Sequence, residues 1–451
     1  MRLNRIIGLF VAAILSACAT YTPQKLPIQV NLATSASAIS VSPAELTFSV
    51  RTHIFNPTDG LDSDEIAMLA VVNNPQLKQA RDGLGIVQAQ SFAAGLLPDP
   101  QLGITFDHPT NGSVGSTNAF NFAPSFDVNA LLLRSSRVNA ANAEERRVNL
   151  DLLWQEWQVV SQARLLFTRI TAQQALLKHL QLSNGLLSDR YQQSQQALAA
   201  GNVTLDIVSA DLAVLQNVGR QLSELERSHL QNRASLSGLL GLAVDAPLKL
   251  DGNSILVEID PNGVRTSLEK RLNHRPDIQA LQAGYSSQEE KFRGAVLAQF
   301  PALNIGITRA RDTSGLYTLG FGLSLSLPIF NANRGNIAIE KTTRKKLFDE
   351  YQDRLNSSYS EIITSLKNLS LLQIQLLQTR QTVVELDKAA RQSKAAYVAG
   401  NMIASDYVHL QIALMDKQTE AINLQEALME QSIALETLLG PDLPRLNRNI
   451  K

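Results

Sequence analysis

The second half of the chain repeats landmarks of the first half at a shift of about 200 residues. Gly201-Asn202 returns as Gly400-Asn401, and Leu239-Leu240-Gly241 returns as Leu438-Leu439-Gly440. Three more landmarks keep nearly the same register: Asn74-Pro75 with Arg275-Pro276, Pro100-Gln101-Leu102 with Pro301-Ala302-Leu303, and Arg134 with Arg334. Each copy has the pattern of a helix, two strands, a long helix, a tight turn and a helix. The sequence therefore predicts a pseudo-symmetric duplicate in which each copy supplies half of one structure.

The composition excludes several classes of function. The 41 basic residues balance 41 acidic ones, so no electrostatic argument favours nucleic acid as a partner. The six histidines show no metal-ligand spacing, and the chain has no nucleophile elbow, metal cluster or phosphate loop. We therefore expect a protein that is not an enzyme and that holds no metal or cofactor.

The amino terminus has the pattern of a secretory signal. Arg2 and Arg5 precede an apolar run of about ten residues, which is too short for a transmembrane helix of about 20. Leu15-Ser16-Ala17-Cys18 resembles a bacterial lipobox, in which the cysteine becomes the first mature residue and carries acyl chains such as palmitate. An ordinary signal with an incidental cysteine is the alternative, but Cys18 is the only cysteine in the chain. We expect a lipoprotein signal peptide at 1–17, lipidation at Cys18, and a tether over 18–60.

Four short segments alternate apolar residues with small or polar ones, at about 100–108, 118–129, 301–309 and 316–329. This period of two is typical of β-strands. In the last segment the apolar residues are Tyr317, Leu319, Phe321, Leu323, Leu325 and Leu327, and the residues that would line a lumen are Gly320, Gly322, Ser324 and Ser326. Its length suits a tilted strand that crosses a bilayer, which needs about 9–11 residues.

The number of predicted strands is too small for a barrel made by one chain. A sheet in a membrane must close, because an open edge leaves unpaired backbone groups in hydrocarbon. The smallest single-chain barrels have about eight strands. The pattern therefore indicates that several copies build one barrel; a four-stranded soluble subdomain is the alternative.

Two stretches predict very long helices. Residues 135–199 contain one glycine and no proline, residues 335–399 contain neither, and each spans about 100 Å if continuous. Apolar residues recur every seven positions at Phe348, Leu355, Ile362, Leu369, Leu376 and Val383, which is typical of coiled-coil packing. The shorter helices, at about 62–96 and 205–240, match the long helix when laid end to end. The connector at 243–263 should then form a belt at mid-height. The helices alone also fit a plain bundle or structural rod.

Each long helix ends at a turn with a glycine, and Gly201 and Gly400 suit the left-handed position that closes a helix. Carboxylates follow these turns and, repeated around a ring, would set an acidic constriction favouring cations. The candidates for this tip or gate are Gly201, Asp206, Asp211, Tyr397, Gly400 and Asp406. A role limited to the helix dipole remains an alternative for Asp206 and Asp406.

The lipobox, the duplicated architecture and the Tyr-x-x-Gly…Asp tip together resemble the TolC-like outer membrane efflux proteins, of the lipidated outer-membrane-factor kind. The resemblance covers about residues 60–441. It divides the chain into a first repeat at 61–242, the equatorial connector at 243–263, a second repeat at 264–441 and a tail at 442–451. In that family the tip closes through tyrosine, aspartate and arginine contacts. Tyr397 and Asp406 occupy two of those positions, but Met402 stands where some members carry the arginine. Asp206 lies five residues past its glycine instead of six.

The resemblance implies an α+β membrane protein: a homotrimer with a twelve-stranded β-barrel in the outer membrane and a coiled-coil α-helical barrel across the periplasm. It implies a passive conduit to the cell exterior, gated at the tip, that docks a periplasmic adaptor (membrane fusion) protein and an inner-membrane pump. The other interpretation is a structural or adhesive coiled-coil lipoprotein of the outer membrane. A rod would have no reason to keep one strand face small, which favours the conduit.

Overall fold

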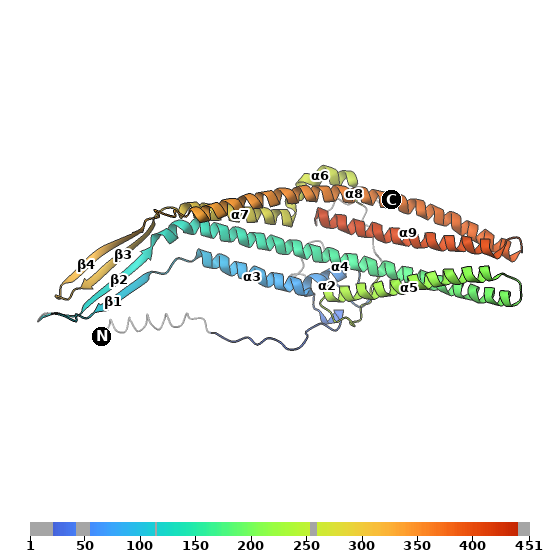
Figure 1. The fold of residues 1–451 in the computed structure, drawn as a ribbon, viewed down its shortest axis with the longest axis horizontal. Helices are drawn as coiled ribbons and strands as arrows, with labels where there is room; N and C mark the ends of the chain where they lie inside the picture. Colours follow the sequence, from blue (N-terminus) through green and yellow to red (C-terminus); the bar gives the residue numbers. More distant parts are fainter. Residues whose placement is uncertain (1–20, 42–54, 113–114, 253–258, 441–451) are drawn as a thin grey trace.

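The computed structural model describes residues 21–41, 55–112, 115–252 and 259–440. A sheet lies at one end of an elongated molecule, and long helices run from it to two turns at the opposite end (Figure 1). The predicted signal peptide at 1–17, the lipidation site Cys18 and the tail at 442–451 lie outside the described residues. Among the helices that are described, none combines the length and hydropathy needed to cross a membrane.

The same order of elements occurs twice along the chain. After a short 3-10 helix, η1 (Ala36–Ala38), come α2 (Ser63–Asn73), α3 (Pro75–Gly95), β1 (Gln101–Asp107), β2 (Ala119–Asp127), α4 (Val128–Ala199) and α5 (Leu205–Leu239). They are followed by α6 (Pro261–His274), α7 (Pro276–Leu297), β3 (Ala302–Arg311), β4 (Tyr317–Ser326), α8 (Arg334–Val398) and α9 (Ala404–Leu439).

The helix predicted at about 62–96 is two helices, α2 and α3. The break falls at Asn74, because the residue before a proline is forced out of the helical region, and Asn74 has ψ 125°. Its side chain then accepts hydrogen bonds from the amides of Gln76 and Leu77, which caps α3. Arg275 before Pro276 makes the same corner between α6 and α7, with ψ 135°.

The sheet is an antiparallel meander in the order β1-β2-β3-β4, and the β2–β3 pair joins the two copies. Strand β2 ends at Asp127, two residues before the predicted end. The Asp127 carboxylate accepts hydrogen bonds from the amides of Asn129 and Ala130, so Val128 starts α4. Strand β4 ends at Ser326, so Leu327, predicted in the strand, lies just beyond it.

The shorter helices pack against the long helix of their own copy: α3 and α5 on α4, and α7 and α9 on α8. Residues of the predicted heptad lie in this seam, since Ile362, Leu369 and Leu376 are buried. The heptad does not continue as a buried seam toward the sheet, where Phe348 is 55% exposed. Helix α4 also packs on α7 and α9, so the two copies share one helical layer.

The joint between the two shorter helices of each copy lies near the middle of the molecule (Figure 1). The Asn74 side-chain amide donates to the Leu239 carbonyl at 2.8 Å, and the Arg275 guanidinium donates to the Leu438 carbonyl at 2.9 Å. Both acceptors belong to the repeated Leu-Leu-Gly landmark. The described part of the connector packs here, with Leu248 buried in the core of the first copy.

Candidate channel wall and periplasmic tip

The sheet separates two chemically different faces. Residues paired directly across an antiparallel ladder lie on the same face. Leu323 pairs with Ile305, and Ile305 pairs with Phe126, which extends the apolar face over three strands. This face is open: Leu319 is 78% and Phe321 73% exposed. A two-sided soluble fold would cover such a surface with a second layer.

The opposite face carries the predicted lumen residues Gly320, Gly322, Ser324 and Ser326. Their partners across the ladder are Thr308, Gly306, Asn304 and Ala302, all small or polar. The space beside them is tight, because a Cβ on Gly306 would lie 2.9 Å from the Pro124 carbonyl oxygen. The sheet is therefore thin on this face, which small and polar side chains cover.

Each long helix closes at its turn with the same hydrogen bonds. Gly201 has φ +74° and Gly400 has φ +75°, in the left-handed region that favours glycine. The Asn202 amide donates to the Ala197 carbonyl at 2.8 Å, and the Asn401 amide donates to the Ala396 carbonyl at 2.9 Å. These are the bonds of a Schellman motif, so both glycines have a structural role.

The predicted acidic residues of the tip lie in two different environments. Asp206 and Asp406 are exposed in the first turns of α5 and α9. Asp211 is buried, and its carboxylate accepts from the Arg190 guanidinium at 2.9 Å within the α4–α5 hairpin. The structure therefore brings Asp211 to Arg190, while Asp206 and Asp406 lie on the surface of the chain.

The second hairpin is closed by an aromatic pair. The Tyr397 and Tyr407 rings are stacked, with centroids 5.1 Å apart and an interplanar angle of 3°. Tyr397 was a predicted tip residue and Tyr407 was not. Tyr407 could have been found from its position, because it directly follows Asp406 in the first turn of α9, which returns from the tip.

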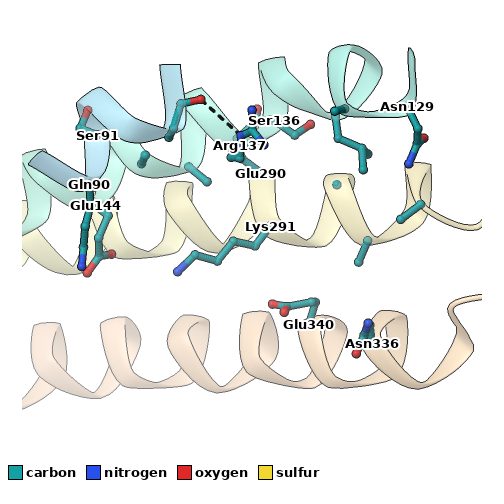
Figure 2. A pocket seen from close by; sticks show the side chains of 18 of the residues that line it. Gln90, Ser91, Asn129, Ser136, Arg137, Glu144, Glu290, Lys291, Asn336 and Glu340 are labelled. Atoms are coloured by element: carbon teal, nitrogen blue, oxygen red, sulfur yellow. Dashed lines mark hydrogen bonds between the residues drawn. The ribbon is translucent and has the colours of Figure 1, made fainter. Parts of the chain in front are cut away.

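A groove of about 730 Å³ lies just below the sheet, between α3, α4, α7 and α8. Figure 2 shows that acidic and basic side chains from three of these helices surround it. The Arg137 guanidinium donates to the Ala94 and Leu96 carbonyls, and Glu144 pairs with Arg147 at 2.7 Å. Among the described residues no group of three or more His, Cys, Asp or Glu side chains could hold a metal ion.

Sequence reasoning gave no role to two arginines on the sheet: Arg309, the last residue of the predicted third strand, and Arg311, just past its predicted end. The structure extends β3 to Arg311, so both side chains continue the alternation begun by Leu303, Ile305 and Ile307. The signal was present, since the period of two runs on unbroken from the apolar residues to the arginines.

The family comparison agrees with this architecture. A family model described as outer membrane efflux protein matches residues 268–441, most of the second copy. Over these residues the chain is similar to the outer membrane efflux proteins.

Two characterised proteins resemble the chain in sequence. The cobalt-zinc-cadmium resistance protein CzcC of Cupriavidus metallidurans is 21% identical over 374 residues, which cover 82% of this chain and 88% of CzcC. The pyoverdine export outer membrane protein OpmQ of Pseudomonas aeruginosa is 25% identical over 250 residues, covering 54% of this chain and 52% of OpmQ.

Solved structures share the fold at low identity. CusC matches with a TM-score of 0.71 and 17% identity over 94% of this chain and all of CusC. The outer membrane protein VceC of Vibrio cholerae matches with a TM-score of 0.71 and 17% identity, over 84% of this chain and 96% of VceC.

Proposed function

We propose that three copies of the chain close one twelve-stranded barrel in the outer membrane, continued by a tunnel of helices through the periplasm. The observation that carries this proposal is the sheet, whose four strands leave β1 and β4 as edges and whose apolar face is open. Hydrocarbon covers such a face without cost, but it does not tolerate the unpaired edges. Pairing β4 of one copy with β1 of the next removes every edge, as closure requires.

The helices support the same assembly. Five of the large apolar side chains exposed on α8 lie along one side of the helix, at Phe348, Tyr359, Ile374, Leu377 and Val384, while Ile339, Leu371, Tyr397 and Val398 are exposed on other sides. At 100° per residue these five positions fall within about 80° of the helix surface. A stripe of this kind marks a protein interface, and a neighbouring copy has helices of matching length to cover it.

In this proposal the chain is the conduit of an export system and performs no chemistry itself. Substrates pass from the periplasm and an inner-membrane pump to the cell exterior. CzcC is named for metal resistance and OpmQ for pyoverdine export, so the shared architecture serves unlike cargo. We assign the choice of substrate to the pump, and the opening of the tip to docking of a periplasmic adaptor.

The gate in this proposal lies at the two turns. Asp206 and Asp406 of three copies would form acidic rings at the narrow end, while Gly201 and Gly400 hold the turns. The stacked Tyr397 and its hairpin would supply the moving contact. Lipidation of Cys18 would anchor the amino terminus in the outer membrane, and the intact mass of the mature protein tests that modification directly.

Single-channel recording in planar bilayers tests the conduit. We expect step conductance from the purified protein, and a larger or more frequent opening when residues 200–203 and 399–402 are replaced by short glycine linkers. Replacement of residues 265–266 by glycines, on the exposed surface of α6, is the matched control and should leave conductance unchanged. A complete absence of channels in the protein with shortened tips would contradict the proposal and favour a structural rod.

A further inference from the structure

We propose that Arg309 and Arg311 form a binding surface on the outside of the barrel for the phosphate groups of lipid headgroups in the outer leaflet. This inference rests on the proposed barrel, because it requires that the apolar face of the sheet meets lipid. It adds a partner and a chemical recognition element that conduction itself does not need.

The ladder register places both arginines on the lipid face. Arg311 pairs with Tyr317 on one side and with Phe120 on the other, and Arg309 pairs with Leu319 and Phe122. Directly opposed residues share a face, so two guanidinium groups stand among aromatic and aliphatic side chains.

The arginines lie at the end of the sheet that is farthest from the helices. The Arg311–Tyr317 pair is the last one before the turn between β3 and β4. From Ala302 to Arg311 the strand rises about 30 Å, which is about 23 Å along the membrane normal at a tilt of roughly 40°. Because the apolar band of such barrels is about 25 Å tall, a band that begins at Ala302 ends at the level of Arg311. With the helices in the periplasm, this is the outer headgroup level.

Neither arginine has a carboxylate partner within the described part of the chain. The Arg311 guanidinium lies over the Tyr317 ring at 5.5 Å, and that ring meets Phe120 edge-on at 6.1 Å. The Arg311 Nε is buried without a hydrogen-bond partner in the described region. The nearby Asp312 carboxylate is occupied by its own turn, where it accepts from the Ser314 and Leu316 amides. The two positive charges therefore need an external anion.

The geometry favours phosphate as that anion. A guanidinium group offers a planar fork of donors that matches two phosphate oxygens, and stacking on an aromatic ring holds the fork in place. Aromatic side chains also mark the headgroup level of membrane proteins, where Tyr317 and Phe120 now lie. Arg309 lies two residues deeper on the same strand, so the pair can hold one phosphate from both sides.

The test uses native mass spectrometry of the full-length protein, with lipids added to the delipidated assembly. The probes are phosphatidic acid, an anionic glycolipid that bears a sulfonate, and a neutral galactolipid with the same acyl chains. We expect phosphatidic acid to bind most tightly, and the double variant Arg309→Gln with Arg311→Gln to bind it about tenfold more weakly, a loss of about 1.4 kcal/mol. The double variant Arg309→Lys with Arg311→Lys keeps both positive charges but not the planar fork of donors, and should bind phosphatidic acid about threefold more weakly.

The matched control removes the same charge elsewhere. Arg227→Gln with Arg391→Gln changes two exposed helix residues and should bind phosphatidic acid like the unaltered protein. Equal binding by the control and by the Arg309 and Arg311 variants overturns the inference, and so does equal affinity for the sulfonate lipid or the galactolipid. Planar-bilayer conductance separates the two levels of the argument: a conducting variant with unchanged lipid binding refutes only the headgroup site, whereas a protein that never conducts refutes the barrel.

Discussion

Arg275 should be the side chain whose loss most weakens the mid-height joint of the second copy. Its side chain is 1% exposed and donates to both oxygens of Asp277, at 2.9 and 2.7 Å. A third bond reaches the Leu438 carbonyl at 2.9 Å, and the guanidinium lies over the Trp154 ring at 4.8 Å. One residue thus connects α6, α7, α9 and α4.

The cost of Arg275→Met follows from the groups that the change leaves behind. Removing one partner of a buried ion pair costs about 3–5 kcal/mol, because the other charge stays buried. Here Asp277 keeps a second partner, the Arg354 guanidinium at 3.0 Å, so the loss of stability should lie near the lower end of this range. The Leu438 carbonyl also loses its hydrogen-bond donor, which adds to the loss of stability, while the methionine side chain keeps part of the packing. We expect the free energy of local unfolding at this joint to fall by about 3 kcal/mol.

Hydrogen–deuterium exchange measures this loss where it occurs. Since each 1.4 kcal/mol is tenfold in an equilibrium constant, amides of α6 and of residues 433–439 should exchange more than about a hundredfold faster. Arg265→Met, an exposed change on the same helix, should leave them unaffected. In the first copy Asn74→Ala removes a cap and one neutral hydrogen bond, so its effect should be nearer 2 kcal/mol. Exchange in Arg275→Met that matches the Arg265 control would refute the reasoning.

Two further predictions concern charge in opposite settings. Burial, and then the nearby Glu430 charge, raise the pKa of Glu426 from 4.5 in the unfolded chain to about 7 in the folded protein. Between these pH values the folded state therefore binds more protons than the unfolded state, and the free energy of unfolding falls as the pH rises from about 4.5 to about 7. Glu426→Gln should therefore raise the free energy of unfolding by about 1 kcal/mol at pH 8, after allowance for the partial exposure of this side chain, and should change it little at pH 4. Thermal unfolding at both pH values measures the gain, and an equal gain at pH 4 and pH 8 would contradict this expectation. On the sheet, Leu323→Arg should cost about 2–4 kcal/mol near the midplane and reduce assembly, whereas Ser324→Arg should assemble normally and change conductance. The opposite outcome for the pair, on gels and in planar bilayers, would reverse the two faces.

The strands and long helices could be predicted from the sequence because each follows one period over many residues. Alternation through Leu319 and Leu323 leaves a single strand register that keeps apolar side chains together. The break before Pro75 was also within reach, since a residue before proline avoids the helical region. Local rules of this kind require no knowledge of the rest of the chain.

Contacts between segments far apart in the sequence were harder to predict, although some of them follow from the position of a turn. Arg190 and Asp211 lie almost equally far from Gly201 in the chain, so an antiparallel hairpin that turns at this glycine must bring them together. The joint is different in kind. Asn74 and Arg275 share no chemistry, yet each donates to the last turn of its returning helix. Only the duplicated position, and not the residue type, marks them as equivalent.

The duplication does not divide the molecule into two domains, and this bears on how the tip can open. Trp157 of α4 donates to the Thr437 carbonyl of α9 at 3.1 Å, and Arg164 bridges Asp64 of the first copy and Glu436 of the second at 2.7 and 3.1 Å. These bonds tie the two copies together at mid-height. Gly201 lies 37 residues beyond Arg164, and Gly400 lies 36 residues before Glu436, which is about 55 Å in each copy at 1.5 Å per residue. Met415 and Ile422 of α9 still pack against the cluster of α4 and α5 that includes Leu187 and Val218. Beyond that cluster each end is held by its own hairpin, through Arg190 with Asp211 or through the stacked tyrosines. A small rotation of one hairpin beyond this shared cluster would therefore be largest at the tip, where the proposed acidic rings lie, while the sheet and the joints stay in place.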